Sequence, residues 1–85
     1  MMVPTVHMNG TAASVLMEEA EEAVHRISHA IDAVRQMTVN GRDYYPQGID
    51  ALGQATREHE ARLNALREVQ RELRDYINAL AEAQP

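Results

Sequence analysis

A period of seven residues runs through the second half of the chain and constrains the fold more than any other feature. It is occupied by Leu52, His59, Leu66, Leu73 and Leu80. Apolar side chains that recur at this spacing form one face of an α-helix that packs along its length against another helix. We therefore expect a helix over residues 50–83, roughly 50 Å long at about 1.5 Å per residue, with Asp50 as its N-cap.

The first half of the chain has a helical period of its own. Apolar residues between positions 11 and 38 recur at spacings of three and four, and glutamates gather in the N-terminal half of this segment, where the helix dipole favours negative charge. Thr11 or Asn9 is expected to cap the start of the helix, and Asn40-Gly41 is expected to end it in the left-handed conformation. Residues 11–38 thus predict a further helix.

Two helices joined by a short segment predict an all-α fold. The segment 39–49 is short enough to bring the helices together as an antiparallel hairpin, and residues 1–10, with alternating apolar side chains and a proline, predict an extended arm. The 85 residues are expected to form a single domain. Thirteen of the apolar residues are alanines, and Phe and Trp are absent, so one copy buries little apolar area. We therefore expect the hairpin to assemble into a homo-oligomer.

The composition argues against several classes of protein. A net charge of −5, with the arginines interspersed among acids, argues against DNA or RNA binding, which needs clustered positive charge. The absence of Cys excludes disulfides and thiol nucleophiles. No run of about 18 apolar residues and no signal-peptide pattern is present, so we expect a cytoplasmic protein without a membrane partner. Because no catalytic spacing stands out, we expect neither an enzyme nor a cofactor.

The segment between the two expected helices is the first candidate for a ligand site. Its chemistry-bearing residues are Arg42, Asp43, Tyr44, Tyr45 and Gln47. Tyrosine faces stack on bases, the Arg42 fork suits a phosphate, and Asp43 or Gln47 can bind ribose hydroxyls or a base edge. The alternative is purely structural: the two tyrosines and Pro46 plug the end of the hairpin, and Arg42 pairs with Asp43. Both interpretations remain open at this point.

The start of the first helix is the second candidate. His7, Asn9 and Thr11 precede it, and free backbone N–H groups at a helix start can bind an anion or a ribose. The alternative is that these residues are ordinary capping residues. In one antiparallel hairpin this segment lies at the opposite end from Arg42 and Tyr45. It can meet them only through a neighbouring subunit that runs the other way.

The histidines form a third candidate group. His25 and His29 have the i, i+4 spacing of helical metal sites and share a face with glutamates, but the glutamate of the zincin pattern is missing between them. We interpret this face as a solvated or intersubunit surface and expect no metal. His59 stands where the seven-residue period otherwise has leucine. We expect it to be buried, with one hydrogen-bond partner, and to fix the register of the helices.

Three segments carry a resemblance. They are His7-Met8-Asn9-Gly10-Thr11, Asn40-Gly41-Arg42-Asp43-Tyr44-Tyr45-Pro46-Gln47-Gly48 and Glu58-His59-Glu60-Ala61-Arg62-Leu63. In this order the segments resemble a family of short, largely uncharacterised phage and prophage proteins, and the resemblance covers nearly the whole chain. It implies a phage origin and no defined biochemistry. In size and expected architecture the chain is also similar to phage sponge proteins that sequester the cyclic nucleotide or cyclic ADP-ribose signals of CBASS and Thoeris immunity.

These observations predict a phage counter-defence protein in the cytoplasm of an infected bacterium. It is expected to bind and sequester a nucleotide-derived immune signal, of the cyclic oligonucleotide or cyclic ADP-ribose type, between its subunits and without catalysis. The alternative is a helical protein–protein interaction module, either a direct inhibitor of a host defence protein or a virion assembly factor. In that case the acidic surface around Glu18 to Glu22 is the expected contact.

Overall fold

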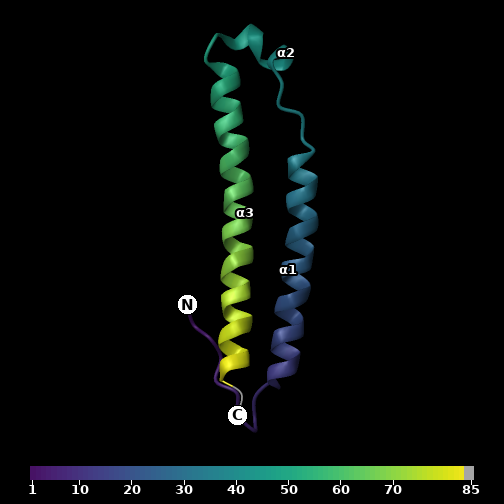
Figure 1. Ribbon diagram of the computed structural model, residues 1–85, viewed down its shortest axis with the longest axis vertical. Coiled ribbons are helices and arrows are strands. Elements are labelled where there is room, and N and C mark those ends of the chain that lie inside the picture. The colour runs from purple at the N-terminus through teal and green to yellow at the C-terminus, as the bar shows by residue number, and fades with distance from the viewer. Residues whose placement is uncertain (84–85) are drawn as a thin grey trace.

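The computed structural model describes residues 1–83 and has the shape of a long hairpin, measuring 62 × 20 × 17 Å (Figure 1). Its two legs are the antiparallel helices α1 (Ala13–Arg35) and α3 (Ala51–Glu82). The turn between them holds the short helix α2 (Gly41–Tyr44) and a single 3-10 turn, η1 (Tyr45–Gln47). Within residues 1–83 no strand occurs, and the expected all-α class is confirmed.

Helix α1 is shorter than the expected 11–38, and its caps differ from the prediction. The N-cap is Ala12, and no side chain caps the helix, so the capping roles expected of Thr11 and Asn9 are wrong. Residues 7–10 instead close a turn, in which the Gly10 N–H donates to the His7 carbonyl over 3.1 Å. Asn and Gly favour turns as well as helix ends, and here Asn9 and Gly10 form part of this turn and do not cap the helix.

The end of α1 also differs from the prediction. The helix stops at Arg35, and its C-cap, Gln36, keeps a right-handed conformation. Asn40-Gly41, expected to be a left-handed stop, is instead the start of α2, because the Asn40 side-chain oxygen accepts a hydrogen bond from the Asp43 N–H over 3.3 Å. Within residues 1–83 the one positive φ belongs to Gly48, at 115°. The chain therefore turns into α3 at Gly48, where a residue with a Cβ would be strained.

Helix α3 spans Ala51–Glu82, against the expected 50–83. Asp50 occupies the N-cap position, but its backbone is right-handed and its side chain makes no capping hydrogen bond. The helix is longer than α1, and its first turns lie beside α2 and the connecting segment (Figure 1). This explains why Leu52, the first member of the seven-residue period, is exposed while Leu80, the last, is completely buried.

The apolar core is small and lies between the two long helices. Its buried members are Ala13, Ala20, Ile31, Leu63 and Leu80. Leu80 is the one large side chain of the described part that is fully buried, with 0% of its surface exposed. Since hydrophobic stabilisation grows with the apolar area removed from water, a core of this size contributes little for a chain of this length.

A buried glutamine holds the two helices in register. Gln70 is 6% exposed, and its Nε2 donates to the Val24 carbonyl over 2.9 Å and to the Ser28 Oγ over 2.6 Å. A glutamine shifted by one helical turn would lose both partners and leave a buried amide unpaired, which costs about 1–3 kcal/mol. Gln70 therefore has the register role that was expected of His59.

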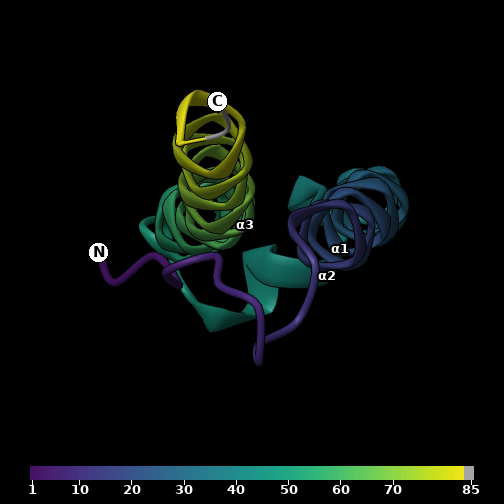
Figure 2. The same ribbon diagram turned by 90° about the horizontal axis from the view of Figure 1, so that it is seen from below.

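The N-terminal arm crosses beneath the open end of the hairpin, from the side of α3 to the start of α1 (Figure 2). Residues 1–7 form no regular secondary structure, and most of their side chains are exposed, with Val3 half-buried. The arm thus lies beside the last turns of α3, at the opposite end from α2 (Figure 1). Among residues 1–83, no helix is both long and apolar enough to cross a bilayer.

Candidate functional site

The turn of the hairpin holds the short helices α2 and η1, and two surface hollows lie against it. Tyr44 ends α2 and is half-buried, whereas Tyr45 begins η1 and is 77% exposed. A hollow of about 560 Å³, which we call the turn hollow, lies between this turn and the start of α3, with Tyr44, Gln47 and Asp50 in its wall. A second hollow, of about 420 Å³, lies against both tyrosines. Tyr44 lines both hollows, whereas Tyr45 lines the second one alone.

The residues predicted at the turn fall into two groups. Tyr44, Tyr45 and Gln47 line the hollows, but Arg42 and Asp43 are exposed on α2 and are not part of the walls. Within the described residues, Arg42 and Asp43 form no ion pair with each other. A plug in the sense of the structural alternative would bury both tyrosines, yet only Tyr44 is partly buried. Tyr45 is thus held on an ordered turn without covering the core.

The charge of the turn hollow is negative. Asp50 and Glu58 line it, and no arginine does, although the Arg62 guanidinium lies 3.9 Å from the Glu58 carboxylate. Carboxylates accept hydrogen bonds from hydroxyl and amine groups and repel phosphate. The hollow itself therefore suits a ribose or the amine edge of a base, and a phosphate attached to such a group would have to point outward, toward the exposed α2 where Arg42 lies.

His59 lies on the other side of Tyr44. Both residues line a smaller hollow of about 150 Å³, together with Val39 and Arg62. His59 is half-buried, and its Nδ1 atom is buried without a hydrogen-bond partner, so the expected single partner is not found for this nitrogen. The reason is that α1 has already ended at Arg35, and the connecting segment lies against His59 in its place. The fold thus leaves one buried imidazole nitrogen without a hydrogen bond beside this hollow.

The N-terminal candidate residues lie at the other end of the molecule. His7, Asn9 and Thr11 precede α1 and are exposed, and the turn lies beyond the far end of a hairpin that is 62 Å long. The His7 ring packs over Gly10, where a Cβ atom would approach the His7 Nε2 to 2.9 Å. One chain therefore does not bring His7, Asn9 and Thr11 together with Tyr44 and Tyr45.

The histidine pair on α1 makes a contact of its own. The rings of His25 and His29 are exposed and meet edge to face, with their centroids 4.4 Å apart. The nearby Glu22 is paired with Arg26 over 2.6 Å, and the hydrogen bond from Arg26 lowers the pKa of Glu22. Within residues 1–83, no three metal-ligating side chains gather at one place. The Glu22 carboxylate thus already has a partner within its own helix.

No protein-family model, curated protein or solved structure matches this chain. The exposed Tyr45, the acidic turn hollow and the orphaned His59 nitrogen are all found within the turn and the first turns of α3. Of these features, the tyrosines were predicted from the sequence, whereas the roles of Asp50 and Glu58 in the wall were not.

Proposed function

We propose that this chain is a non-catalytic helical hairpin that binds and sequesters a nucleotide-derived signalling molecule at its turn. The observation that carries the proposal is the exposure of Tyr45: a large aromatic side chain is 77% exposed on an ordered turn, where it lines the second hollow. Exposed aromatic rings on rigid supports are stacking platforms for bases, worth about 1–3 kcal/mol per base. Since Tyr45 contributes little to the core, binding is the best account of its position.

The surroundings of Tyr45 suit the rest of a nucleotide. Asp50 and Glu58 in the turn hollow can accept hydrogen bonds from ribose hydroxyls or base amines. Arg42, exposed on the adjacent α2, can pair with a phosphate, and Gln47 can bind a base edge. A cyclic oligonucleotide or a cyclic ADP-ribose isomer contains all of these groups. Sequestration requires binding and burial alone, so the proposal needs no catalytic residue.

The proposal includes a homo-oligomer. The core of one hairpin is small, and apolar side chains such as Val15 and Val69 remain exposed along both legs. A second copy that runs in the opposite direction would cover such side chains and would bring the partner's N-terminal segment, with Asn9 and Thr11, toward the turn. The bound signal would then lie between subunits, which buries more of it than an open turn can.

The biological setting follows from the resemblance to short phage and prophage proteins. A phage protein that binds an immune signal in the cytoplasm of its bacterial host prevents the signal from reaching its effector. Such a protein acts by mass action and must be made in excess of the signal. A small chain without a cofactor suits this task, because each copy costs the phage little.

Thermal melting with a panel of ligands tests this proposal. The purified protein is mixed with cyclic dinucleotides, cyclic trinucleotides and cyclic ADP-ribose isomers, and unfolding is followed by circular dichroism. A ligand at a hundredfold excess over its Kd stabilises the folded state by about 2.7 kcal/mol. We expect one ligand class to raise the Tm of the wild type and to have a much smaller effect on Tyr45→Ala. If no ligand of the panel shifts the Tm, the proposal fails.

A second function is favoured by one observation. Ile49, beside Tyr45 at the tip of the turn, is 98% exposed, and two neighbouring apolar side chains on a protruding tip are typical of a protein-binding surface. In this alternative the chain is an interaction module that inhibits a host defence protein or assists virion assembly. The melting panel distinguishes the two functions, because the interaction module predicts that none of the nucleotides shifts the Tm, whereas the sequestering protein predicts that one class of them does.

A further inference from the structure

A groove runs along the side of the hairpin at mid-length, away from the turn. It has a volume of about 400 Å³, and both long helices line it. Three of the eight arginines of the chain lie in its wall, Arg35 from α1 and Arg67 and Arg74 from α3, with Asp32 as the one acid. The net charge of the wall is therefore positive, although the chain as a whole carries −5. We call this feature the arginine groove.

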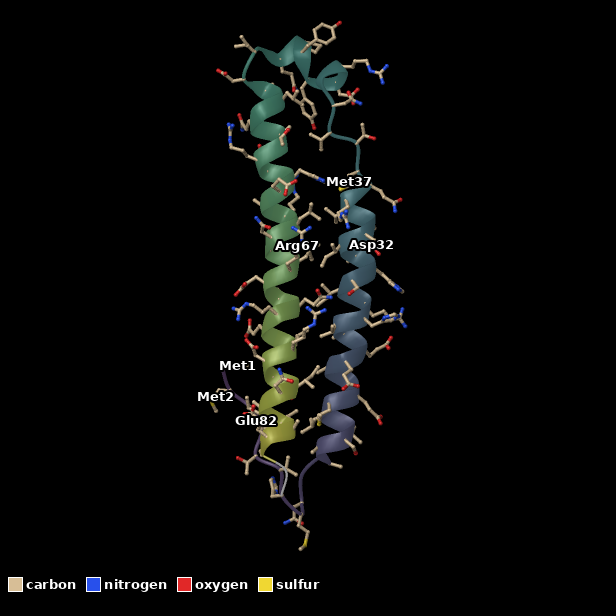
Figure 3. The ribbon with its side chains drawn as sticks, in the orientation of Figure 1. Met1, Met2, Asp32, Met37, Arg67 and Glu82 are labelled. Atoms are coloured by element: carbon tan, nitrogen blue, oxygen red, sulfur yellow. The ribbon has the colours of Figure 1, made fainter. Side chains whose placement is uncertain are left out.

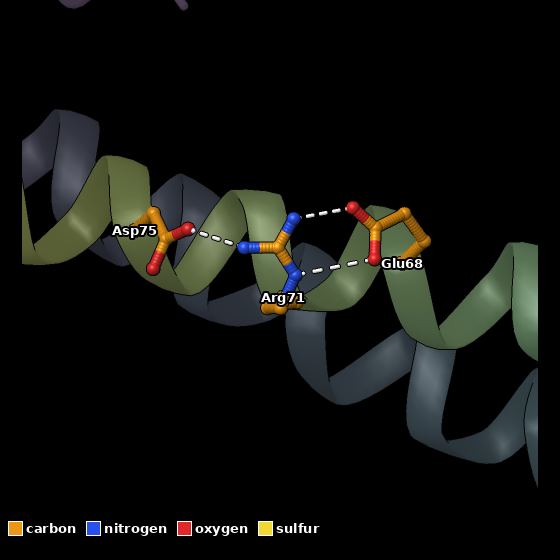
Figure 4. A network of polar contacts seen from close by, with 3 residues as sticks. All are labelled: Glu68, Arg71 and Asp75. Atoms are coloured by element: carbon orange, nitrogen blue, oxygen red, sulfur yellow. Dashed lines mark hydrogen bonds and ion pairs between the residues drawn. The ribbon is translucent and has the colours of Figure 1, made fainter.

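The arginines of this groove lack the ion pairs that Arg26, Arg62 and Arg71 have. Arg26 and Arg62 each pair with a glutamate four residues earlier in the same helix. Arg71 donates to Glu68 and to Asp75 on the outer face of α3 (Figure 4). Within residues 1–83, by contrast, Arg35, Arg67 and Arg74 have no carboxylate within ion-pair distance, and Arg67 contacts only the Asn64 amide oxygen, over 3.3 Å. Three guanidinium groups thus remain free to bind an anion.

The floor of the groove is held rigidly. Gln70 lies between Arg67 and Arg74 and links α3 to α1 through its bonds to Val24 and Ser28. Because the Ser28 Oγ accepts from Gln70 over 2.6 Å, its own hydroxyl proton is free to be donated to a ligand in the groove. Arg67 and Asp32 lie at the same level on the two legs of the hairpin (Figure 3). The groove therefore combines a fixed hydroxyl donor with flexible cations around it.

We propose that the arginine groove binds a small anion with two or three linked phosphates, for which pyrophosphate and tripolyphosphate are the simplest representatives. Arg67 and Arg74 stand two helical turns apart, roughly 10 Å along α3, so their guanidinium groups can bind different phosphates of one chain. Guanidinium forks bind phosphate oxygens through paired, charge-assisted hydrogen bonds. Arg35 would complete the site from α1, and the Ser28 hydroxyl would donate to the same anion.

This proposal is independent of the site at the turn. Arg67 lies about 13 Å along α3 from Glu58, the last residue of the turn hollow in the sequence. The acidic turn hollow and the arginine groove also differ in the sign of their charge. Binding of an oligophosphate in the groove would persist in Tyr45→Ala, so the failure of one proposal leaves the other testable.

Isothermal titration with tripolyphosphate at low ionic strength tests the site. The double variant Arg67→Gln and Arg74→Gln is compared with the control Arg57→Gln and Arg71→Gln, which changes the net charge equally on the same helix but outside the groove. We expect the first variant to weaken binding at least about tenfold, which corresponds to about 1.4 kcal/mol, and the control to weaken it less than about threefold. Equal losses in the two variants, or no binding to the wild type, would overturn the proposal.

The single acid of the groove provides a test with the opposite sign. Asp32 repels a bound anion, so Asp32→Asn should tighten tripolyphosphate binding several-fold, whereas the control Asp75→Asn, outside the groove, should not. Size-exclusion chromatography of the same variants completes the experiment. If Arg67→Gln and Arg74→Gln dissociate an oligomer and the wild type does not bind tripolyphosphate, the groove is a contact between subunits and the proposal is wrong.

Discussion

The two ends of α3 differ in how tightly they are packed. The residues that stabilise the fold lie toward one end, and the residues of the candidate site at the turn lie toward the other. Toward its C-terminus, α3 buries Leu80 completely, and at mid-length it buries Leu63 and holds its register through Gln70. Toward its N-terminus, Leu52 is exposed and the buried Nδ1 of His59 lacks a partner. The packed region lies against α1, whereas the loose region begins where α1 has already ended. The features that suggest nucleotide binding at the turn lie in the loose region, where side chains are not committed to the core, whereas the arginine groove lies beside the packed region.

The largest expected effect is that of a change in the packed region. Leu80→Ala removes a completely buried side chain and should lower the free energy of unfolding by about 2–5 kcal/mol, through lost transfer energy and a residual cavity. Glu60→Ala, a control at an exposed position of the same helix, should lower it by less than about 0.5 kcal/mol. Urea unfolding followed by circular dichroism measures both values. Similar losses in the two variants would contradict the position assigned to the core.

The two tyrosines of the turn should differ in a smaller but clear way. Tyr44 is half-buried between three hollows, and Tyr44→Ala should destabilise the fold by about 1–2 kcal/mol, less than the truncation of a fully buried aromatic. Tyr45→Ala should leave the stability nearly unchanged, because the Tyr45 ring is mostly exposed. The same unfolding measurement compares them. Should Tyr45→Ala prove the more destabilising of the two, Tyr45 is the plug and the proposed stacking platform is lost.

A change at His59 should stabilise the loose region. His59→Leu removes a buried nitrogen that has no partner and restores the apolar residue of the seven-residue period. We expect a gain of about 1 kcal/mol in the free energy of unfolding, since an unpaired buried polar group costs about 1–3 kcal/mol. The Tm of the variant, measured at pH 7, checks this expectation. A clear loss of stability would show that His59 makes an interaction that its position does not reveal.

The smallest expected effect concerns the exposed ion pairs on both legs. Hydrogen bonds from Arg26 and Arg71 lower the pKa of Glu22 and of Glu68. A carboxyl whose pKa is lowered by folding stabilises the fold above its unfolded pKa, and the contribution is lost as the pH falls through the folded pKa. The Tm difference between the wild type and Glu68→Gln should therefore be small at pH 7 and vanish in acid. A difference that grows toward acid pH would contradict this sign.

The two long helices were predictable because their apolar period persists over many turns and depends little on any one residue. Helix ends were less predictable, because they depend on single residues with more than one role. Asn40-Gly41 illustrates this: the preference of Asn for the N-cap is as strong as its tolerance of the left-handed stop. Because α1 already ends at Arg35, Asn40 is free to serve as the N-cap of α2.

The candidate sites were predictable where their residues are neighbours in the sequence. Tyr44 and Tyr45 were predictable as site residues because two tyrosines are adjacent in a short connecting segment. Their different burial was not predictable, because it depends on how the single turn of α2 lies against α3. The burial of Gln70 was not predicted, because a polar side chain is usually exposed. Its spacing of seven residues from both Leu63 and Ile77 places it on their buried face of the helix. The arginine groove combines residues of two helices, and they become neighbours only once the register of the hairpin is known.

The central claim is that the turn binds a ligand through side chains that the fold does not need. It is tested most directly by measuring the Tm and the affinity for the stabilising ligand of the panel side by side, for Tyr45→Ala and Arg42→Ala. We predict that both variants have nearly the wild-type Tm, because a surface substitution changes the free energy of unfolding by no more than about 0.5 kcal/mol. Binding should weaken by about 1–3 kcal/mol in each, from the loss of stacking or of a charge-assisted phosphate bond. Unchanged affinity in both variants, or losses of affinity that only follow losses of stability, would contradict the claim.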